Sequence, residues 1–198
     1  MRNKIVAIFI SISFILGSFS VEIAAQTKSG EGTETNPYII ETTEQLNSIR
    51  EDITACYKLG SDIDLNNETW ISISQFSGTL DGDGYVIRNL DTKGTGSFFA
   101  NCQGTLKNIV LENVTATNGA LVGNLTGTVD SCIAKGKISI QDGGGLVGYA
   151  SGNASVKNSG VQGNLTVQGG TYGGGLIGNT YGSTVSVENC FVTGNLSI

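Results

Sequence analysis

The sequence of 198 residues contains no histidine. Catalysis by a Ser-His-Asp or Cys-His arrangement and a zinc site built on histidine are therefore excluded. Only 14% of the residues are charged, and the arginines that follow Arg2 are Arg50 and Arg88. A carbohydrate-active β-helix would need acidic and basic residues clustered on one face, which this composition hardly provides. We expect a non-enzymatic protein with no catalytic residues and no cofactor-binding residues.

Positive charge is scarce over the whole chain. Lysine and arginine together number 11 against 17 acidic residues, so that the net charge is −6 at pH 7. Proteins that bind nucleic acid or anionic membrane surfaces rely on basic patches. The charge balance therefore argues against both kinds of partner.

Proline occurs once, at Pro37, whereas glycine occurs 29 times. Many glycines, little charge and few reactive side chains are typical of a β protein rich in turns. The chain is long enough for one domain of this kind.

One apolar run, Ile5–Leu16, follows two basic residues and leads to small residues that end in Ala24-Ala25. This order is typical of a secretory signal peptide, and the run is short for a membrane span. We predict that residues 1–25 are removed, with cleavage after Ser20 as the alternative. The mature chain then has 173 residues and a net charge of −7, because two basic residues and one acidic residue are lost. It is expected to be secreted or displayed on the cell surface, with no membrane span.

A phrase of five residues recurs in the second half of the chain. It reads Gly-Ala-Leu-Val-Gly at Gly119–Gly123, Gly-Gly-Leu-Val-Gly at Gly144–Gly148 and Gly-Gly-Leu-Ile-Gly at Gly174–Gly178, with a degenerate copy at Gly96–Ala100. The central residues are Phe98, Leu121, Leu146 and Leu176, at intervals of 23, 25 and 30 residues. Repeats of this length are typical of stacked solenoids. The predicted fold is all-β, a right-handed parallel β-helix (β-solenoid).

A second aligned segment follows each phrase. The four copies are Leu106–Leu111, Val129–Ala134, Val156–Val161 and Val187–Val192, and Ile87–Leu90 fits as a partial copy. Their third positions hold Asn108, Ser131, Asn158 and Asn189. If the first and sixth positions both point inward, the chain must turn a corner between them, which asparagine tolerates. Stacked asparagines can hydrogen-bond to the residues above and below, so we predict a polar ladder there. A third short strand closes the last three coils, at Ile138–Ile140, Leu165–Val167 and Leu196–Ile198.

The N-terminal part has a different pattern. Thr42–Gln45 fits a capping box, which predicts a short amphipathic helix as far as about Asp52. Such a helix can cover the first coil of a solenoid. Strand-like segments follow at Cys56–Leu59, Ile63–Leu65 and Trp70–Ile73. We therefore divide the mature chain into a capping segment (26–55), first coils (56–95) and repeats (96–198), the last expected to lack a C-terminal cap.

These motifs resemble the bacterial GLUG-motif surface proteins, which are named for a Gly-Leu-hydrophobic-Gly core. The N-terminal segments that carry the same resemblance are Asn36–Ile40, Thr43–Leu46, Tyr57–Leu59, Asp62–Leu65 and Gly78–Gly84. The first repeat departs from the pattern, because Phe98-Phe99 replaces Leu-Val. The resemblance implies a secreted or cell-surface β-solenoid, often adhesin-like and sometimes the non-catalytic part of a surface peptidase of the immunoglobulin A protease type. It implies no active site.

The four cysteines, Cys56, Cys102, Cys132 and Cys190, include no Cys-x-x-Cys pair. Cys132 and Cys190 occupy equivalent positions two coils apart, roughly 10 Å at about 4.8 Å per coil, which is too far for a disulfide. We expect both to be buried free thiols. A disulfide between Cys56 and Cys102 stays open.

Four aspartates, Asp62, Asp64, Asp81 and Asp83, are the candidates for a polar site. Paired carboxylates bind calcium or serve as acid and base in glycosidases. Asp81-Gly-Asp83-Gly lacks the further ligands of a complete calcium loop, however, and Asp-Gly pairs are common in turns. Turn structure is the favoured interpretation, with calcium binding and catalysis as alternatives.

Aromatic side chains could form a platform for sugars, or could simply cover the solenoid. The candidates are Trp70, Tyr85, Tyr149, Tyr172 and Tyr181. Together these features predict an adhesin-like module or a structural stalk. A carbohydrate-binding or carbohydrate-active β-helix and a fragment of a larger surface peptidase are the alternatives. The partners expected are a host or cell-surface glycan or protein, and a second copy through end-to-end association.

Overall fold

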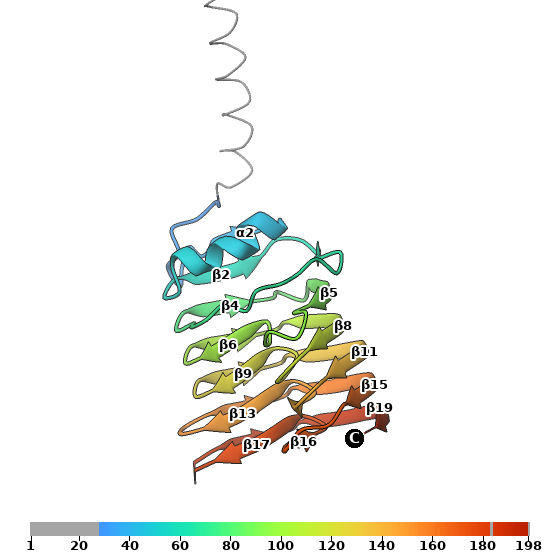
Figure 1. Cartoon of the computed structure of the whole chain (residues 1–198). Helices are drawn as coiled ribbons and strands as arrows, with labels where there is room; N and C mark the ends of the chain where they lie inside the picture. Colours follow the sequence, from blue (N-terminus) through green and yellow to red (C-terminus); the bar gives the residue numbers. More distant parts are fainter. Residues whose placement is uncertain (1–27, 183, 198) are drawn as a thin grey trace, which may run out of the picture.

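The computed structural model describes residues 28–182 and 184–197, and it consists almost entirely of parallel β-strands stacked as a solenoid (Figure 1). Three long sheets form its sides. Sheet A contains, in spatial order, β1 (Tyr38–Ile40), β2 (Cys56–Leu59), β4 (Thr79–Asp81), β7 (Thr105–Lys107), β10 (Thr128–Asp130), β14 (Ser155–Lys157) and β18 (Ser186–Glu188). Sheet B contains β3 (Ile63–Asp64), β5 (Val86–Asp91), β8 (Val110–Ala116), β11 (Ile133–Ile140), β15 (Gly160–Val167) and β19 (Phe191–Ser197).

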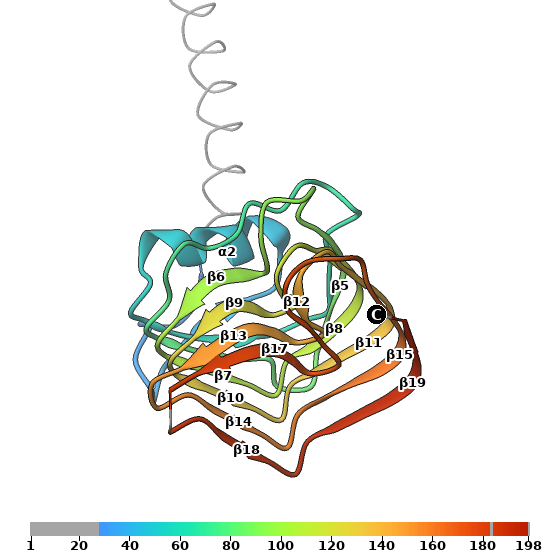
Figure 2. The same ribbon diagram turned by 60° about the horizontal axis from the view of Figure 1, so that its bottom comes forward.

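Sheet C contains β6 (Phe99–Cys102), β9 (Val122–Leu125), β13 (Val147–Ser151) and β17 (Ile177–Tyr181), and a pair of short strands, β12 (Gly143–Gly144) and β16 (Gly173–Gly174), lies beside it. Each later coil runs through sheets C, A and B in turn, as β9, β10 and β11 do (Figure 2). Hydrogen bonds between equivalent positions therefore join residues such as Asn101 and Asn124, which are 23 apart, or Asn158 and Asn189, which are 31 apart. The predicted parallel β-helix is confirmed.

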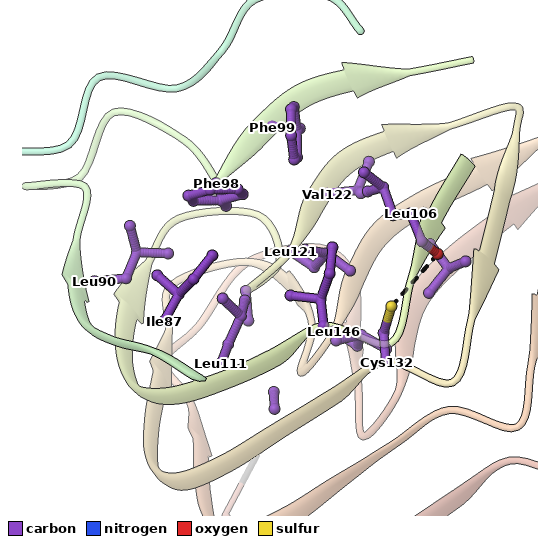
Figure 3. Packing of buried hydrophobic residues seen from close by; sticks show 14 of the residues in the cluster. Ile87, Leu90, Phe98, Phe99, Leu106, Leu111, Leu121, Val122, Cys132 and Leu146 are labelled. Atoms are coloured by element: carbon purple, nitrogen blue, oxygen red, sulfur yellow. Dashed lines mark hydrogen bonds between the residues drawn. The ribbon is translucent and has the colours of Figure 1, made fainter. Parts of the chain in front are cut away.

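The interior is a set of apolar rows, because each coil places its inward side chain above the same side chain of the coil before. Sheet A shows this most simply: from β4 to β14 the middle residue of each strand points inward, and Leu80, Leu106 and Val129 pair in register with no exposure to solvent. Close packing of Ile87, Phe98, Leu111, Leu121 and Leu146 fills the space between the sheets (Figure 3). Burial of these rows is the main stabilising contribution.

The repeated Gly-Leu-Val-Gly phrase has a steric cause. Its leucines, Leu121 and Leu146, are completely buried, whereas its glycines meet the backbone of the neighbouring coil. A Cβ atom on Gly119 would lie 2.5 Å from the Gly148 nitrogen, and one on Gly144 would lie 2.5 Å from the Gly178 nitrogen. The phrase therefore brings the backbones of two successive coils closer than any side chain allows.

The predicted corners are present. Asn108, Ser131, Asn158 and Asn189 all have left-handed backbone angles, with φ of 54°, 56°, 50° and 51°. Each splits its segment into a strand of sheet A and a strand of sheet B, which is how both apolar ends point inward.

The alignment of Ile87–Leu90 with these segments is wrong. Ile87 pairs with Leu111 in sheet B, and the true equivalent of Leu106 is Leu80. Asn89 belongs instead to a second kind of kink, inside sheet B, where φ is 58°. Asn113 (φ 56°) occupies the same position one coil later. A short Ile-x-Asn-Leu motif fits either corner, because both need a residue that tolerates positive φ.

The N-terminal helix ends where it was predicted to end, but its second half is a 3₁₀-helix. α2 covers Thr43–Asn47, and a 3₁₀-helix, η1 (Ser48–Glu51), continues it. The Thr42 hydroxyl accepts a hydrogen bond from the Gln45 amide at 3.2 Å, as the capping box requires. Leu46 and Ile49 are completely buried against the first coil, so that the helices cover this end of the stack.

Trp70–Ile73 is not a strand, although its residues were expected to form one. The backbone there makes only single bridges, from Thr69 to Asp91 and from Ile73 to Phe99. The Trp70 side chain explains this: it turns inward, stacks on Phe98 at 5.0 Å and donates its indole N–H to the Phe98 carbonyl oxygen at 3.0 Å. This segment therefore closes the first coil by side-chain packing.

All four cysteines are free thiols, Cys56 and Cys102 included. The pairing of Ile133 with Gly160 and of Gly160 with Phe191 places Cys132 and Cys190 two coils apart, as predicted. The Cys132 thiol donates to the Leu106 carbonyl oxygen at 3.4 Å, and burial raises its pKa to about 12 (Figure 3). The expectation that Cys190 is buried is wrong, because it lies in the last described coil and is only partly covered.

The predicted signal peptide lies outside the described residues. Within residues 28–182 and 184–197, the structure has no helix with the length and apolar character needed to cross a membrane.

Replacing Gly148 by alanine tests the steric role of the phrase. The added Cβ would lie 2.7 Å from the carbonyl oxygens of Asn118 and Gly123, neither of which can move without separating two coils. We expect Gly148→Ala to lower the free energy of unfolding by about 1–3 kcal/mol. Gly175→Ala is the matched control, because its Cβ would meet only the Val192 methyl groups at 3.2 Å. Urea unfolding of both variants measures the difference, and equal losses would contradict the steric explanation.

Candidate functional site

The outer face of sheet A carries two regular rows of polar side chains. In β4, β7, β10 and β14 the middle residue points inward, so the first and last residues lie on the outer face. The first residues form a hydroxyl row after Cys56: Thr79, Thr105, Thr128, Ser155 and Ser186. The last residues form a charged row: Lys58, Asp81, Lys107, Asp130, Lys157 and Glu188. The sign of the charge alternates at every step.

The charged row is held together by contacts between successive coils. The Lys107 ammonium lies 3.2 Å from an Asp81 carboxylate oxygen, and the Lys157 ammonium lies 3.4 Å from Asp130. The next residue adds an amide donor in both cases: Asn108 donates to Asp81 at 2.9 Å, and Asn158 donates to Asp130 at 3.0 Å. A Lys-Asn pair of one coil therefore clamps the aspartate of the coil before it.

These contacts lower the pKa of both aspartates. For Asp130, the largest cause is the hydrogen bond from Asn158, with Lys157 adding to it. Burial alone would raise the pKa of Asp81, but hydrogen bonds from Asn108, the Asp83 backbone and Lys107 outweigh it, and the pKa lies below its usual value. Both carboxylates are therefore charged at neutral pH and serve as acceptors for the next coil.

A groove of about 460 Å³ lies at the N-terminal end of this face. Its lining residues include Glu34 and Pro37 from the N-terminal segment, and Cys56, Lys58, Thr79, Asp81, Thr105 and Lys107 from the two rows. The groove is shallow and polar. It offers hydroxyl groups, one thiol and charges of both signs to a ligand that forms hydrogen bonds.

The structure does not bring the four candidate aspartates together. Asp62 lies just before β3 and 2.7 Å from Arg88, and Asp64 lies within β3 and accepts from the Asn89 amide at 2.8 Å. Asp81 belongs to the charged row, and Asp83 lies 3.0 Å from Lys58.

Two of the carboxylates form turns, because Asp64 accepts from the Asn66 backbone and Asp81 from the Asp83 backbone. Among the described residues, no group of three or more His, Cys, Asp or Glu side chains could hold a metal ion.

The candidate aromatic residues are dispersed as well. Trp70 is buried, whereas Tyr181 is 83% exposed. Tyr149 and Tyr172 pack edge to face with ring centres 5.6 Å apart, beside Asp142, which accepts from the Tyr172 backbone. An edge-to-face pair covers the surface but offers no flat double platform for a sugar ring.

Sequence reasoning missed the charged row, although a signal for it was present. The aligned segments Leu106–Leu111, Val129–Ala134, Val156–Val161 and Val187–Val192 carry Lys, Asp, Lys and Glu at their second positions. Stacking in register turns that alternation along the sequence into ion pairs in space.

No protein-family model matches the chain, so that membership of the GLUG-motif family stays an expectation. The chain is 30% identical over 195 residues to "Halomucin" of Haloquadratum walsbyi, which covers 84% of the chain but 2% of that protein. It is 33% identical over 178 residues to a "Putative Gly-rich membrane protein" of Evansella cellulosilytica, which covers 82% of the chain and 18% of that protein. The chain thus spans only a small part of these curated relatives.

A solved structure has a similar fold. A "putative immunoglobulin A1 protease" from Bacteroides ovatus superposes with a TM-score of 0.55 and 19% sequence identity, over 84% of this chain and 69% of that chain. At this identity the likeness concerns the fold alone.

The charged row predicts acid sensitivity. The pKa values of Asp81 and Asp130 are lowered by folding, so their contribution to stability is present above the unfolded value of about 3.9 and is lost as the pH falls through the folded values. We expect the thermal midpoint of unfolding to decrease as the pH is lowered from about 5 to about 2. The decrease should be smaller in the double variant Asp81→Asn, Asp130→Asn, which lacks both carboxylates. Glu68→Gln, outside the row, is the control. An unchanged pH dependence in the double variant would contradict a stabilising role of the row.

Proposed function

We propose that the chain is a non-enzymatic β-solenoid module of a secreted or cell-surface protein, with a structural or adhesin-like role. The observation that carries this proposal is the pairing within the charged row. Lys107 and Lys157 neutralise the aspartates of the preceding coils, and the hydroxyl row beside them is uniform. Such a face is built to hold coils together and repeats the same chemistry at each step, whereas an active site gathers different groups at one point.

The comparisons support a place at the cell surface. One relative is named as a mucin and the other as a membrane protein, and both are far longer than the matched region. The structural likeness to a protease chain is compatible with a non-catalytic region of a surface peptidase, as the GLUG resemblance implies. With seven strands in sheet A stacked at about 4.8 Å, one such module has a height of roughly 30 Å.

The electrostatics of the groove support the absence of catalysis. A glycosidase needs one carboxylic acid with a raised pKa to protonate the leaving group. Asp81, which lines the groove together with Glu34, has a lowered pKa and is bound by Lys107 and Asn108. It is therefore poorly suited to act as the acid.

A durable surface module should resist proteases. Digestion of the whole chain with trypsin tests this resistance. Most lysines and arginines lie within strands, whereas Lys93 lies in an exposed turn. We expect early cleavage after Lys28 and Lys93 and slow cleavage at Lys107, Lys135 and Lys157. The heat-unfolded chain, which should be cut at every site, is the control. Early fragments that end at Lys107 or Lys157 would contradict the proposed role.

Carbohydrate binding in the groove is the second candidate, because Thr79 and Thr105 hydroxyls lie there beside Lys58 and Asp81. A glycan array probed with the whole chain tests it. Binding that is lost in Thr79→Ala, Thr105→Ala but kept in Thr128→Ala, which changes the same row outside the groove, would favour this candidate. The absence of binding, or equal binding by all variants, would leave the structural role as the better proposal.

A further inference from the structure

The charged row of sheet A combines protruding and recessed side chains. The side chains of Lys107 and Lys157 are each 42% exposed, whereas those of Asp81 and Asp130 are 20% and 29% exposed. An ammonium group has three N–H donors. Within residues 28–182 and 184–197, each of these two lysines makes one ion pair. Both lysines therefore keep donors for a further carboxylate, one that belongs to another molecule.

The face that carries these side chains is regular and open. β4, β7, β10 and β14 pair in unbroken register, and Figure 2 shows β7, β10 and β14 side by side along one side of the coil. The hydroxyl row beside the charges has Thr105 and Thr128 at its centre. Because threonine is much shorter than lysine, this row does not keep a second surface away from the charges.

The order of charges on this face is complementary to its own reverse. From β4 to β14 the row reads Asp81, Lys107, Asp130 and Lys157. Two copies that lie face to face and antiparallel therefore bring Lys107 opposite the partner's Asp130, and Asp81 opposite the partner's Lys157. Each contact occurs twice, because a two-fold interface uses the same surface of both copies. All four charges of each copy then meet an opposite charge.

Other arrangements of the two faces lack this match. A two-fold axis along the solenoid would place the charged row of one copy over the hydroxyl row of the other. An antiparallel pair shifted by one coil would set lysine against lysine and aspartate against aspartate, which is destabilising. Charge therefore selects the antiparallel direction and excludes every shift by an odd number of coils.

We propose that the outer face of sheet A binds a second copy of this chain, face to face and antiparallel, with the two-fold axis between β7 and β10. This lateral contact goes beyond the structural role proposed above, and it differs from the end-to-end association expected from the sequence. The strands are three residues long, so the interface is narrower than that of a stable dimer and a single contact is weak. In a protein that carries several such modules, the contacts add up through multivalency.

The test titrates the isotope-labelled whole chain with unlabelled chain at low ionic strength and follows the backbone amides by NMR. We expect shifts in β7, β10 and β14 that grow with concentration. They should disappear in about 1 M salt, which screens exposed charges. The absence of such shifts on sheet A, or equal shifts on sheets A and B, would overturn the proposal. The structural role of the row is independent of this result, because acid unfolding measures it within one chain.

Two charge reversals, Asp130→Lys and Lys107→Asp, test the pairing itself. In a homodimer of either variant, two contacts between opposite charges become contacts between like charges. We therefore expect each variant alone to associate about fivefold more weakly than the original chain. A mixture of the two variants again sets lysine opposite aspartate at both positions, so the mixed pair should recover the original affinity. Mixed binding as weak as that of each variant alone would overturn the antiparallel register.

Both reversals also place like charges in successive coils of one chain, which needs a control. Lys135→Asp is matched, because it sets a carboxylate beside Glu112 on sheet B and leaves sheet A unchanged. It should keep the original affinity, and an equal fivefold loss would overturn a contact through sheet A. The amide spectra show directly whether each variant is folded. Asp130→Asn gives a second test that retains the shape of the side chain: binding should weaken about twofold, and unchanged binding would count against the proposal.

Discussion

Stacking in register is the constraint on which the rest of this structure depends. Parallel hydrogen bonds between successive coils place each residue beside its equivalent at about 4.8 Å, so every position must be compatible with the same position of its neighbours. Apolar side chains satisfy this by packing on one another, as Leu80, Leu106 and Val129 do. Glycine satisfies it where two backbones meet, as Gly119 and Gly148 do.

Charged side chains cannot be stacked on their own kind, and the chain solves this by alternation. Like charges directly opposite each other destabilise a sheet, and opposite charges stabilise it. Sheet A alternates from Lys58 to Glu188, and sheet B does the same from Asp64 through Arg88 and Glu112 to Lys135. A repeat of identical coils would not have this option. The sequence divergence between coils at these positions is therefore a condition of stability.

The repeated features could be predicted from the sequence, and the unique ones could not. Leu121, Leu146 and Leu176 mark the coils, and the corners at Asn108, Asn158 and Asn189 follow from the need to turn two apolar positions inward. The kink at Asn89 was misassigned because its equivalents in the next two coils are Asn113 and Gly136. Since these positions do not share one residue type, the sequence does not show that they are equivalent. The alternating charges of the charged row are present in the sequence, and the register of the strands is the further information needed to predict the row.

Segments that occur once gave the remaining errors. Trp70–Ile73 has the composition of a strand, but the buried indole of Trp70 bonds to Phe98 and prevents regular pairing. The change from α2 to the 3₁₀-helix η1 at Ser48 is likewise a detail that local propensity does not encode. A segment that occurs once cannot be compared with equivalent segments of other coils. Its structure therefore has to be predicted from a single stretch of sequence.

The two ends of the solenoid are chemically different because the ladders have a direction. Amide donors point toward the earlier coil and acceptors toward the later one, as the pairs of Asn158 with Asp130 and of Asn195 with Asn164 show. At the N-terminal end, α2 and η1 cover the interior and need no such complement. The contacts that stabilise the stack thereby also fix the order of its coils, since a coil with the wrong charge at one position would meet a like charge without compensation.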